Sequence, residues 1–128
     1  MKKILLFATL LLLTACQETL EDRCARECKE YTQKKCPVLV TNGVTLDSMT
    51  FDKSQLLMTY YYTVSGILDD AEALRENNAS SLLLKELKNT AALKLYKDAG
   101  YSFRYVYHST KEKGTRVLDT TFRKEDYQ

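Results

Sequence analysis

The stretch from residue 55 to 65 alternates between two kinds of side chain more regularly than any other part of the chain. A period of two is typical of a strand that buries one of its faces. The face predicted to meet the core carries Leu56, Met58, Tyr60, Tyr62 and Val64. The opposite face carries Leu57, Thr59, Tyr61, Thr63 and Ser65.

Three other segments also have the pattern of strands. Residues 44–52 alternate weakly and reach the 55–65 segment through the polar turn Asp52-Lys53-Ser54, which predicts a β-hairpin. Residues 101–109 alternate clearly, and the turn 111–114 leads to a last strand over 115–123, so a second hairpin is predicted. A short apolar run, 38–40, stands before the turn signal Asn42-Gly43.

A helical segment separates the two hairpins. Asp69 and Asp70 offer a cap for a helix over 70–88, which Asn77-Asn78 weakens or breaks, and a shorter helix follows over 90–97 before Gly100. The predicted fold class is therefore α+β: an antiparallel sheet of two β-hairpins with a helical segment between them, ββαββ. The predicted core is Leu56, Met58, Tyr60, Tyr62, Leu84, Leu87, Leu95, Phe103, Tyr105 and Phe122.

A short N-terminal helix is predicted ahead of the strands. Within residues 17–35, Leu20, Cys24, Cys28 and Tyr31 recur at helical spacing, and Pro37 ends the helix. Helical geometry does not favour a disulfide between Cys24 and Cys28, so we expect Cys36 to pair with one of them. The spacing matches no common zinc signature, and we predict no metal site and no cofactor.

The first 15 residues have the pattern of a signal peptide. Lys2 and Lys3 precede an apolar run from Ile4 that ends in small residues. This run is too short to span a membrane, which takes about 20 apolar residues. The predicted organisation is a signal peptide over 1–15, a tether and helix with cysteines over 16–36, and one α+β domain over 37–128.

The residues Leu13-Thr14-Ala15-Cys16 resemble the lipobox of bacterial lipoproteins. This resemblance implies cleavage before Cys16 and a diacylglycerol on its sulfur, that is, a protein anchored in the membrane by lipid. Gln17 differs from the Asp of an inner-membrane retention signal, so we expect the outer membrane, with the protein facing the periplasm.

The later part of the chain also resembles a known group. Cys36-Pro37-Val38, Thr45-Leu46-Asp47-Ser48, Tyr60-Tyr61-Tyr62 and Tyr105-Val106-Tyr107 are similar to segments of small bacterial secreted and lipoprotein domains. The similarity covers residues 36–127. It implies a fold of that kind and no particular activity.

Composition and motifs narrow the possible functions. Without Lys2 and Lys3, the 19 Lys and Arg residues fall to 17 and balance the 17 Asp and Glu residues, which argues against an electrostatic nucleic-acid binder. The face opposite the core is predicted to hold Tyr61, Arg104 and His108, which suit the recognition of an envelope protein partner. We therefore expect a binding or scaffolding module. The alternatives are an enzyme that acts on an envelope polymer through His108 and an acid, or an exclusion or immunity lipoprotein.

Overall fold

The computed structural model describes residues 17–128. The predicted N-terminal helix is present as α2 (Leu20–Lys35). Thr19 caps it, because its Oγ1 accepts a hydrogen bond of 3.1 Å from the backbone N–H of Asp22. Acidic residues in the first turn and basic residues in the last complement the helix dipole. The predicted helix boundaries and the observed ones therefore agree closely.

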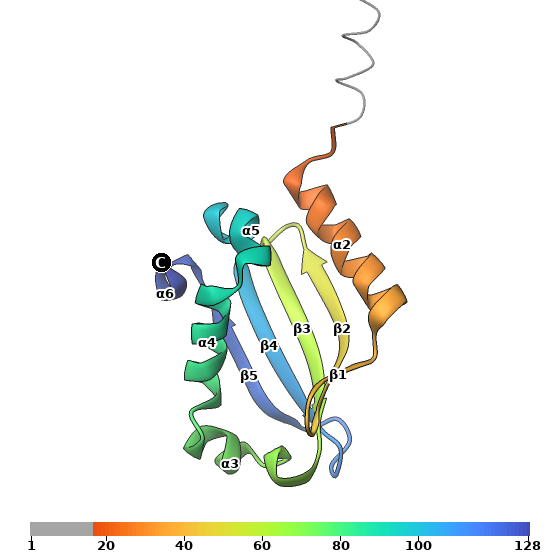
Figure 1. The fold of residues 1–128 in the computed structure, drawn as a ribbon, viewed down its shortest axis with the longest axis vertical. Helices are drawn as coiled ribbons and strands as arrows, with labels where there is room; N and C mark the ends of the chain where they lie inside the picture. Colours follow the sequence, from red (N-terminus) through yellow and green to blue (C-terminus); the bar gives the residue numbers. More distant parts are fainter. Residues whose placement is uncertain (1–16) are drawn as a thin grey trace, which may run out of the picture.

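Five strands form a single sheet in the order β1-β2-β3-β4-β5 (Figure 1). Their bounds are β1 (Val38–Thr41), β2 (Val44–Asp52), β3 (Leu57–Val64), β4 (Ser102–Ser109) and β5 (Arg116–Phe122). The apolar run at 38–40 is thus a short edge strand of its own. The predicted α+β class, with an N-terminal helix before the strands, is confirmed.

One strand pair differs from the predicted antiparallel sheet. The β1–β2, β2–β3 and β4–β5 pairs are antiparallel, whereas β3 and β4 run parallel, with Tyr60 beside Tyr105 and Tyr62 beside Tyr107. The reason lies in the connection. The segment between these strands contains η1 (Gly66–Leu68), α3 (Ala71–Glu76), α4 (Ala79–Asn89), η2 (Ala91–Leu93) and α5 (Lys94–Asp98). A crossover of this length returns the chain to the end of the sheet where β3 began, as a parallel pair requires.

Two turns set the hairpins that precede this crossover. Asp52 Oδ1 accepts hydrogen bonds from the backbone N–H groups of Ser54 (2.9 Å) and Gln55 (3.3 Å), so the chain turns before Leu56. Strand β3 then starts at Leu57. Gly43 joins β1 to β2 with φ +80°, and a Cβ there would lie 2.9 Å from the carbonyl oxygen of Ser65. Glycine is therefore required at this close approach.

The helices and the buried sheet residues form one core on one face of the sheet. Most of the predicted core residues are buried, but Leu95 is 52% exposed and Leu84 is only half-buried, since Leu83 and Leu87 face the sheet instead. The core also includes residues that the strand patterns did not identify: Cys24, Cys28, Val44, Leu46, Leu74, Tyr96, Tyr101 and Tyr127.

The helical segment breaks where the two asparagines stand. Asn78 has φ +54°, a left-handed conformation that ends α3 and starts α4 in a new direction. A last helix, α6 (Lys124–Tyr127), was not predicted from the sequence. It brings Tyr127 into the core, where its hydroxyl lies 2.8 Å from the carbonyl oxygen of Tyr101 and can donate to it.

Candidate functional site

A groove of about 370 Å³ lies on the helical side of the sheet, between the β1–β2 hairpin and α4. Figure 1 shows β3 and β4 crossing the space between α2 and α4. The walls of the groove are Val40, Thr41 and Val44 on one side and Leu83, Glu86, Thr90 and Leu93 on the other. Its floor consists of four tyrosines, Tyr60, Tyr62, Tyr105 and Tyr107, which we call the tyrosine array.

The tyrosine array follows from the register of the two central strands. Alternation places Tyr60 and Tyr62 on the same face of β3, and the parallel pairing sets them beside Tyr105 and Tyr107 of β4. The rings of Tyr60 and Tyr105 stack with centroids 5.1 Å apart and planes 6° from parallel. Tyr62 and Tyr107 lie 4.9 Å apart at 58°. Such pairs stabilise the sheet and hold each phenol in a fixed direction.

The hydroxyl groups of the tyrosine array are free to meet a ligand. Among residues 17–128, the tyrosine hydroxyls that make hydrogen bonds are those of Tyr96 and Tyr127. In the same part of the chain, one tyrosine hydroxyl, that of Tyr101, is buried from solvent without a hydrogen-bond partner, and Tyr101 is not a member of the array. The array hydroxyls are therefore unpaired and not sealed from solvent, and their tyrosines line the groove. Burial raises their pKa above the usual tyrosine value, so they remain protonated and can both donate and accept hydrogen bonds.

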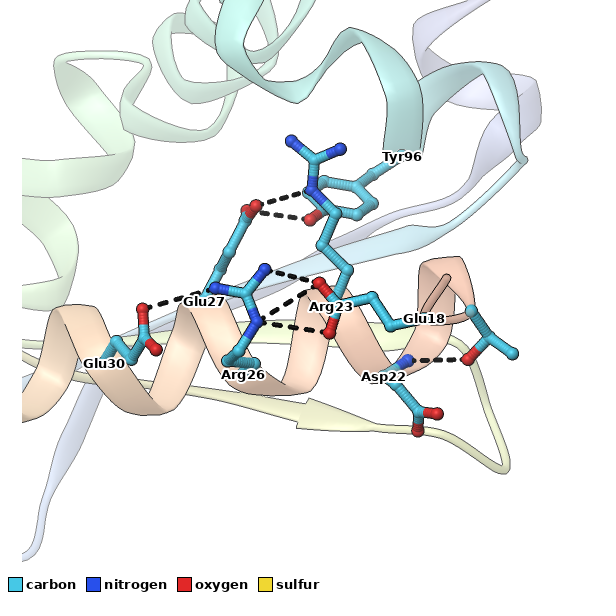
Figure 2. A network of polar contacts seen from close by, with 8 residues as sticks. Glu18, Asp22, Arg23, Arg26, Glu27, Glu30 and Tyr96 are labelled. Carbon is cyan, nitrogen blue, oxygen red and sulfur yellow. Dashed lines mark hydrogen bonds and ion pairs between the residues drawn. The ribbon is translucent and has the colours of Figure 1, made fainter. Parts of the chain in front are cut away.

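Helix α2 is held beside this site by polar contacts (Figure 2). Glu27 accepts hydrogen bonds from the hydroxyl of Tyr96 on α5 (2.8 Å) and from Nε of Arg23 (2.7 Å). The contact with Tyr96 joins two helices that are 69 residues apart in sequence. At the other end of α2, the Thr32 hydroxyl accepts from the N–H of Met49 at 2.9 Å. It thereby satisfies the edge of β2 beyond the end of β1.

The binding face predicted from the sequence has its three residues together, on the opposite side of the sheet. Tyr61 and His108 stack with ring centroids 6.3 Å apart. Arg104 binds Asp119 of β5 through two hydrogen bonds, of 2.8 and 2.6 Å. Val106 lies among these residues, paired with Tyr61 on β3 and with Asp119 on β5, and it is fully buried. This face therefore satisfies much of its own polar surface.

The cysteines do not meet as predicted. Cys24 and Cys28 are both buried on the inner side of α2, and Cys36 follows its last residue. Cys36 stands eight positions after Cys28, just past the end of α2, which is roughly 12 Å along the helix axis, and Cys24 is farther away. A disulfide needs Cα atoms about 4.4–6.8 Å apart. The pairing of Cys36 with Cys24 or Cys28 therefore does not fit this helix, and all three thiols are free.

Other predictions from the sequence meet the structure only in part. Cys16 and the signal peptide lie outside the described residues, so their cleavage and lipidation stay predictions. Within residues 17–128, no helix is long and apolar enough to cross a membrane. The same residues contain no group of three or more His, Cys, Asp or Glu side chains placed to hold a metal ion.

A family model covers most of the chain. It is described as a domain of unknown function, DUF8479, and it matches residues 19–118. The chain belongs to the DUF8479 family. No curated protein sequence matches it.

Two solved structures have a similar fold. One is a protein of Pseudomonas aeruginosa described as secreted, with a TM-score of 0.65 and 14% identity over 88% of this chain and 100% of the other. The second is the pilotin EpsS of the Vibrio vulnificus type 2 secretion system, with a TM-score of 0.64 and 12% identity over 85% of this chain and 92% of the other. At these identities the likeness concerns the fold of this DUF8479 domain.

The groove was missed by sequence reasoning for an identifiable reason. Alternation puts Tyr60, Tyr62 and Tyr105 in the predicted core, with Tyr107 on the same face as Tyr105, and this pattern by itself predicts only packing. Whether their hydroxyls open into a groove depends on how far α4 lies from β1, which no local pattern encodes. The one available signal was the repeated Tyr-x-Tyr spacing at 60–62 and 105–107, which gives two adjacent strands the same wet-tipped aromatic face.

Proposed function

We propose that this DUF8479 protein is a lipid-anchored lipoprotein of the bacterial envelope that binds a segment of an envelope protein in the tyrosine groove. The observation that carries the proposal is the tyrosine array: three buried tyrosines and the half-buried Tyr60 line the groove, and their hydroxyls make no hydrogen bond within residues 17–128. Tyrosine supplies large contact area at low entropic cost, and it is enriched at the centres of protein interfaces.

Two further points support an envelope protein as the partner. The lipobox resemblance at Cys16 supports a lipid anchor, and Gln17 after it supports an address at the outer membrane, facing the periplasm. EpsS, which has a similar fold, is the pilotin of a secretion system. Only three residues, 17–19, separate Cys16 from the start of α2, so the lipid would hold this domain close to the membrane surface. Stable anchoring takes more than one acyl chain, which a diacylglyceryl cysteine provides.

The face formed by Tyr61, Arg104 and His108 is the second candidate surface. The grouping of the three side chains favours it, as the sequence predicts. The double hydrogen bond between Arg104 and Asp119 disfavours it, because a partner would have to compete with a satisfied ion pair. The groove offers unpaired hydroxyls instead, and we therefore place the partner there.

Two adjacent residues of β1 allow a matched test of the two surfaces. Val40 lines the groove and is 54% exposed, whereas Leu39 is 68% exposed and points to the opposite face. We expect Val40→Lys to abolish recovery of a specific partner with the protein purified from envelopes in detergent. Leu39→Lys should leave it unchanged, with equal melting temperatures as the control for folding. The reverse pattern would assign binding to the open face, and no enriched protein with the wild type would contradict the proposal.

The anchor has its own test. Labelled fatty acid should be incorporated into the wild-type protein and not into Cys16→Ala. Equal labelling of both proteins would contradict the lipid anchor and would leave the groove to be judged by the previous experiment.

A further inference from the structure

Glu86 gives the groove a negative charge. Among the described residues that line the groove, it is the one acidic residue, and no Lys, Arg or His of the described part of the chain stands beside it in the lining. Its carboxylate lies near enough to the tyrosine array to contribute to the raised pKa values of Tyr62, Tyr105 and Tyr107, after burial itself. This exposed residue therefore lies close to the floor of the groove.

No basic side chain within residues 17–128 pairs with Glu86. This differs from Glu18, which precedes α2, and from Glu27 and Glu30 of α2, each of which binds an arginine (Figure 2). The next basic residues of α4, Lys85 and Lys88, do not line the groove. Glu86 is an exposed residue at the rim of the groove, so its carboxylate is accessible to a cation that a partner segment brings beside the tyrosines of the floor.

The orientation of the rings determines how a cation would be held. Tyr60 and Tyr105 stack on each other, and Tyr60 lies nearly parallel to Tyr62, at 18°, with their centroids 6.4 Å apart. Their faces are therefore occupied by one another, and hydroxyl groups point into the groove. This arrangement does not form a cage of open aromatic faces of the kind that binds quaternary ammonium groups. It offers oxygen acceptors, which suit a cation that has N–H donors.

The following inference rests on the proposed function. We propose that the groove selects an apolar partner segment that carries one lysine or arginine, and that Glu86 binds this cation. The N–H groups of the cation donate to the Glu86 carboxylate and to phenol oxygens of the array. The apolar neighbours of the cation in the partner segment pack against Val40, Leu83 and Leu93. The charge then fixes the register of the segment, while the apolar contacts supply most of the affinity.

The test uses random linear peptides displayed on phage as the probe, and the lipidated protein purified in detergent as the bait. Peptides are selected on the wild type against Val40→Lys as the blocked groove. Two charge-reversed baits follow, Glu86→Lys and Glu76→Lys. Glu76 is an exposed acid on α3 that does not line the groove, so this control changes the net charge equally.

We expect the wild type to enrich apolar peptides with a single Lys or Arg. Glu86→Lys should weaken the best of them by at least about tenfold and enrich peptides with Asp or Glu instead, while Glu76→Lys should change neither. Enrichment of apolar peptides without preference for a basic residue would overturn this inference and leave the groove as a binding site. No enrichment over Val40→Lys would overturn the proposed function itself.

Discussion

Asp69 is a buried carboxylate that joins the helical crossover to the β4–β5 hairpin. It is 3% exposed, and its Oδ2 accepts hydrogen bonds from the backbone N–H groups of Thr110 and Lys111, both at 2.9 Å. The sequence suggested that Asp69 and Asp70 cap a helix. Asp70 does so by accepting from the N–H of Glu72 at 2.8 Å, whereas Asp69 holds a distant turn.

Asp69 should make the stability of the protein depend on pH. Hydrogen bonds from the Ser109 side chain and from the backbone of Lys111 and Thr110 hold the pKa of Asp69 below its usual value. A carboxyl group whose pKa is lower in the folded state contributes stability above its unfolded pKa of about 3.9. That contribution is lost as the pH falls through the folded pKa.

We therefore expect Asp69→Asn to melt a few degrees lower than the wild type at pH 7. The difference should shrink as the pH falls below about 4, the unfolded pKa, and through the lower pKa of Asp69 in the folded protein. Thermal melting followed by circular dichroism between neutral and acidic pH measures both. A difference that stays constant over this range would show that the charge of Asp69 does not contribute.

Tyr101 and Tyr127 give a matched pair of buried hydroxyls. The Tyr101 hydroxyl is buried without a partner, while its ring stacks on Phe51 and Tyr96. The Tyr127 hydroxyl lies within hydrogen-bonding distance of the carbonyl oxygens of Tyr101 and Lys97. Tyr101→Phe should leave the free energy of unfolding unchanged or raise it by up to about 1 kcal/mol, and Tyr127→Phe should lower it by about 1 kcal/mol. Urea unfolding measures both, and a clear loss in Tyr101→Phe would mean that its hydroxyl has a partner, such as a buried water.

At the scale of elements, α4 and α5 show what leucine spacing can and cannot predict. Leu87 is 1% exposed and Leu95 is 52% exposed, although the sequence placed both in the core. Leu87→Ala should destabilise the protein by roughly 2–5 kcal/mol, as for a fully buried leucine. Leu95→Ala should cost less than about 0.5 kcal/mol, as for a surface site. Similar costs for the two variants in urea unfolding would contradict the orientation of these helices.

The strand patterns predicted more of the molecule than the helical patterns did. Alternation is a local property, so it gave the buried sets of β3 and β4, and it placed Tyr61, Arg104 and His108 together on the opposite face. The direction of β4 relative to β3 depends on where the crossover ends, which made the central pair parallel. The exposure of Leu95 depends on the break at η2 between α4 and α5, which resets the helical phase.

At the scale of the whole molecule, the arrangement separates two faces with different chemistry. The helical face contains the groove, with its unpaired hydroxyls and the unpaired Glu86. The other face pairs its charges internally, with Asp119 bound to both Arg104 and Arg116. This difference between the two faces cannot be predicted from the sequence, because it depends on which strands are neighbours and on which part of the sheet the helices leave uncovered.

Photo-crosslinking in intact cells tests the central claim, that a protein partner lies in the tyrosine groove, most directly. A photoreactive phenylalanine analogue is placed at Val40, inside the groove, or at Leu39, the adjacent residue on the other face. We predict that light produces one discrete protein adduct from position 40 and none from position 39. We further predict that Glu86→Lys reduces the adduct at position 40. A discrete adduct from position 39 alone, or no protein adduct from position 40, would contradict this account.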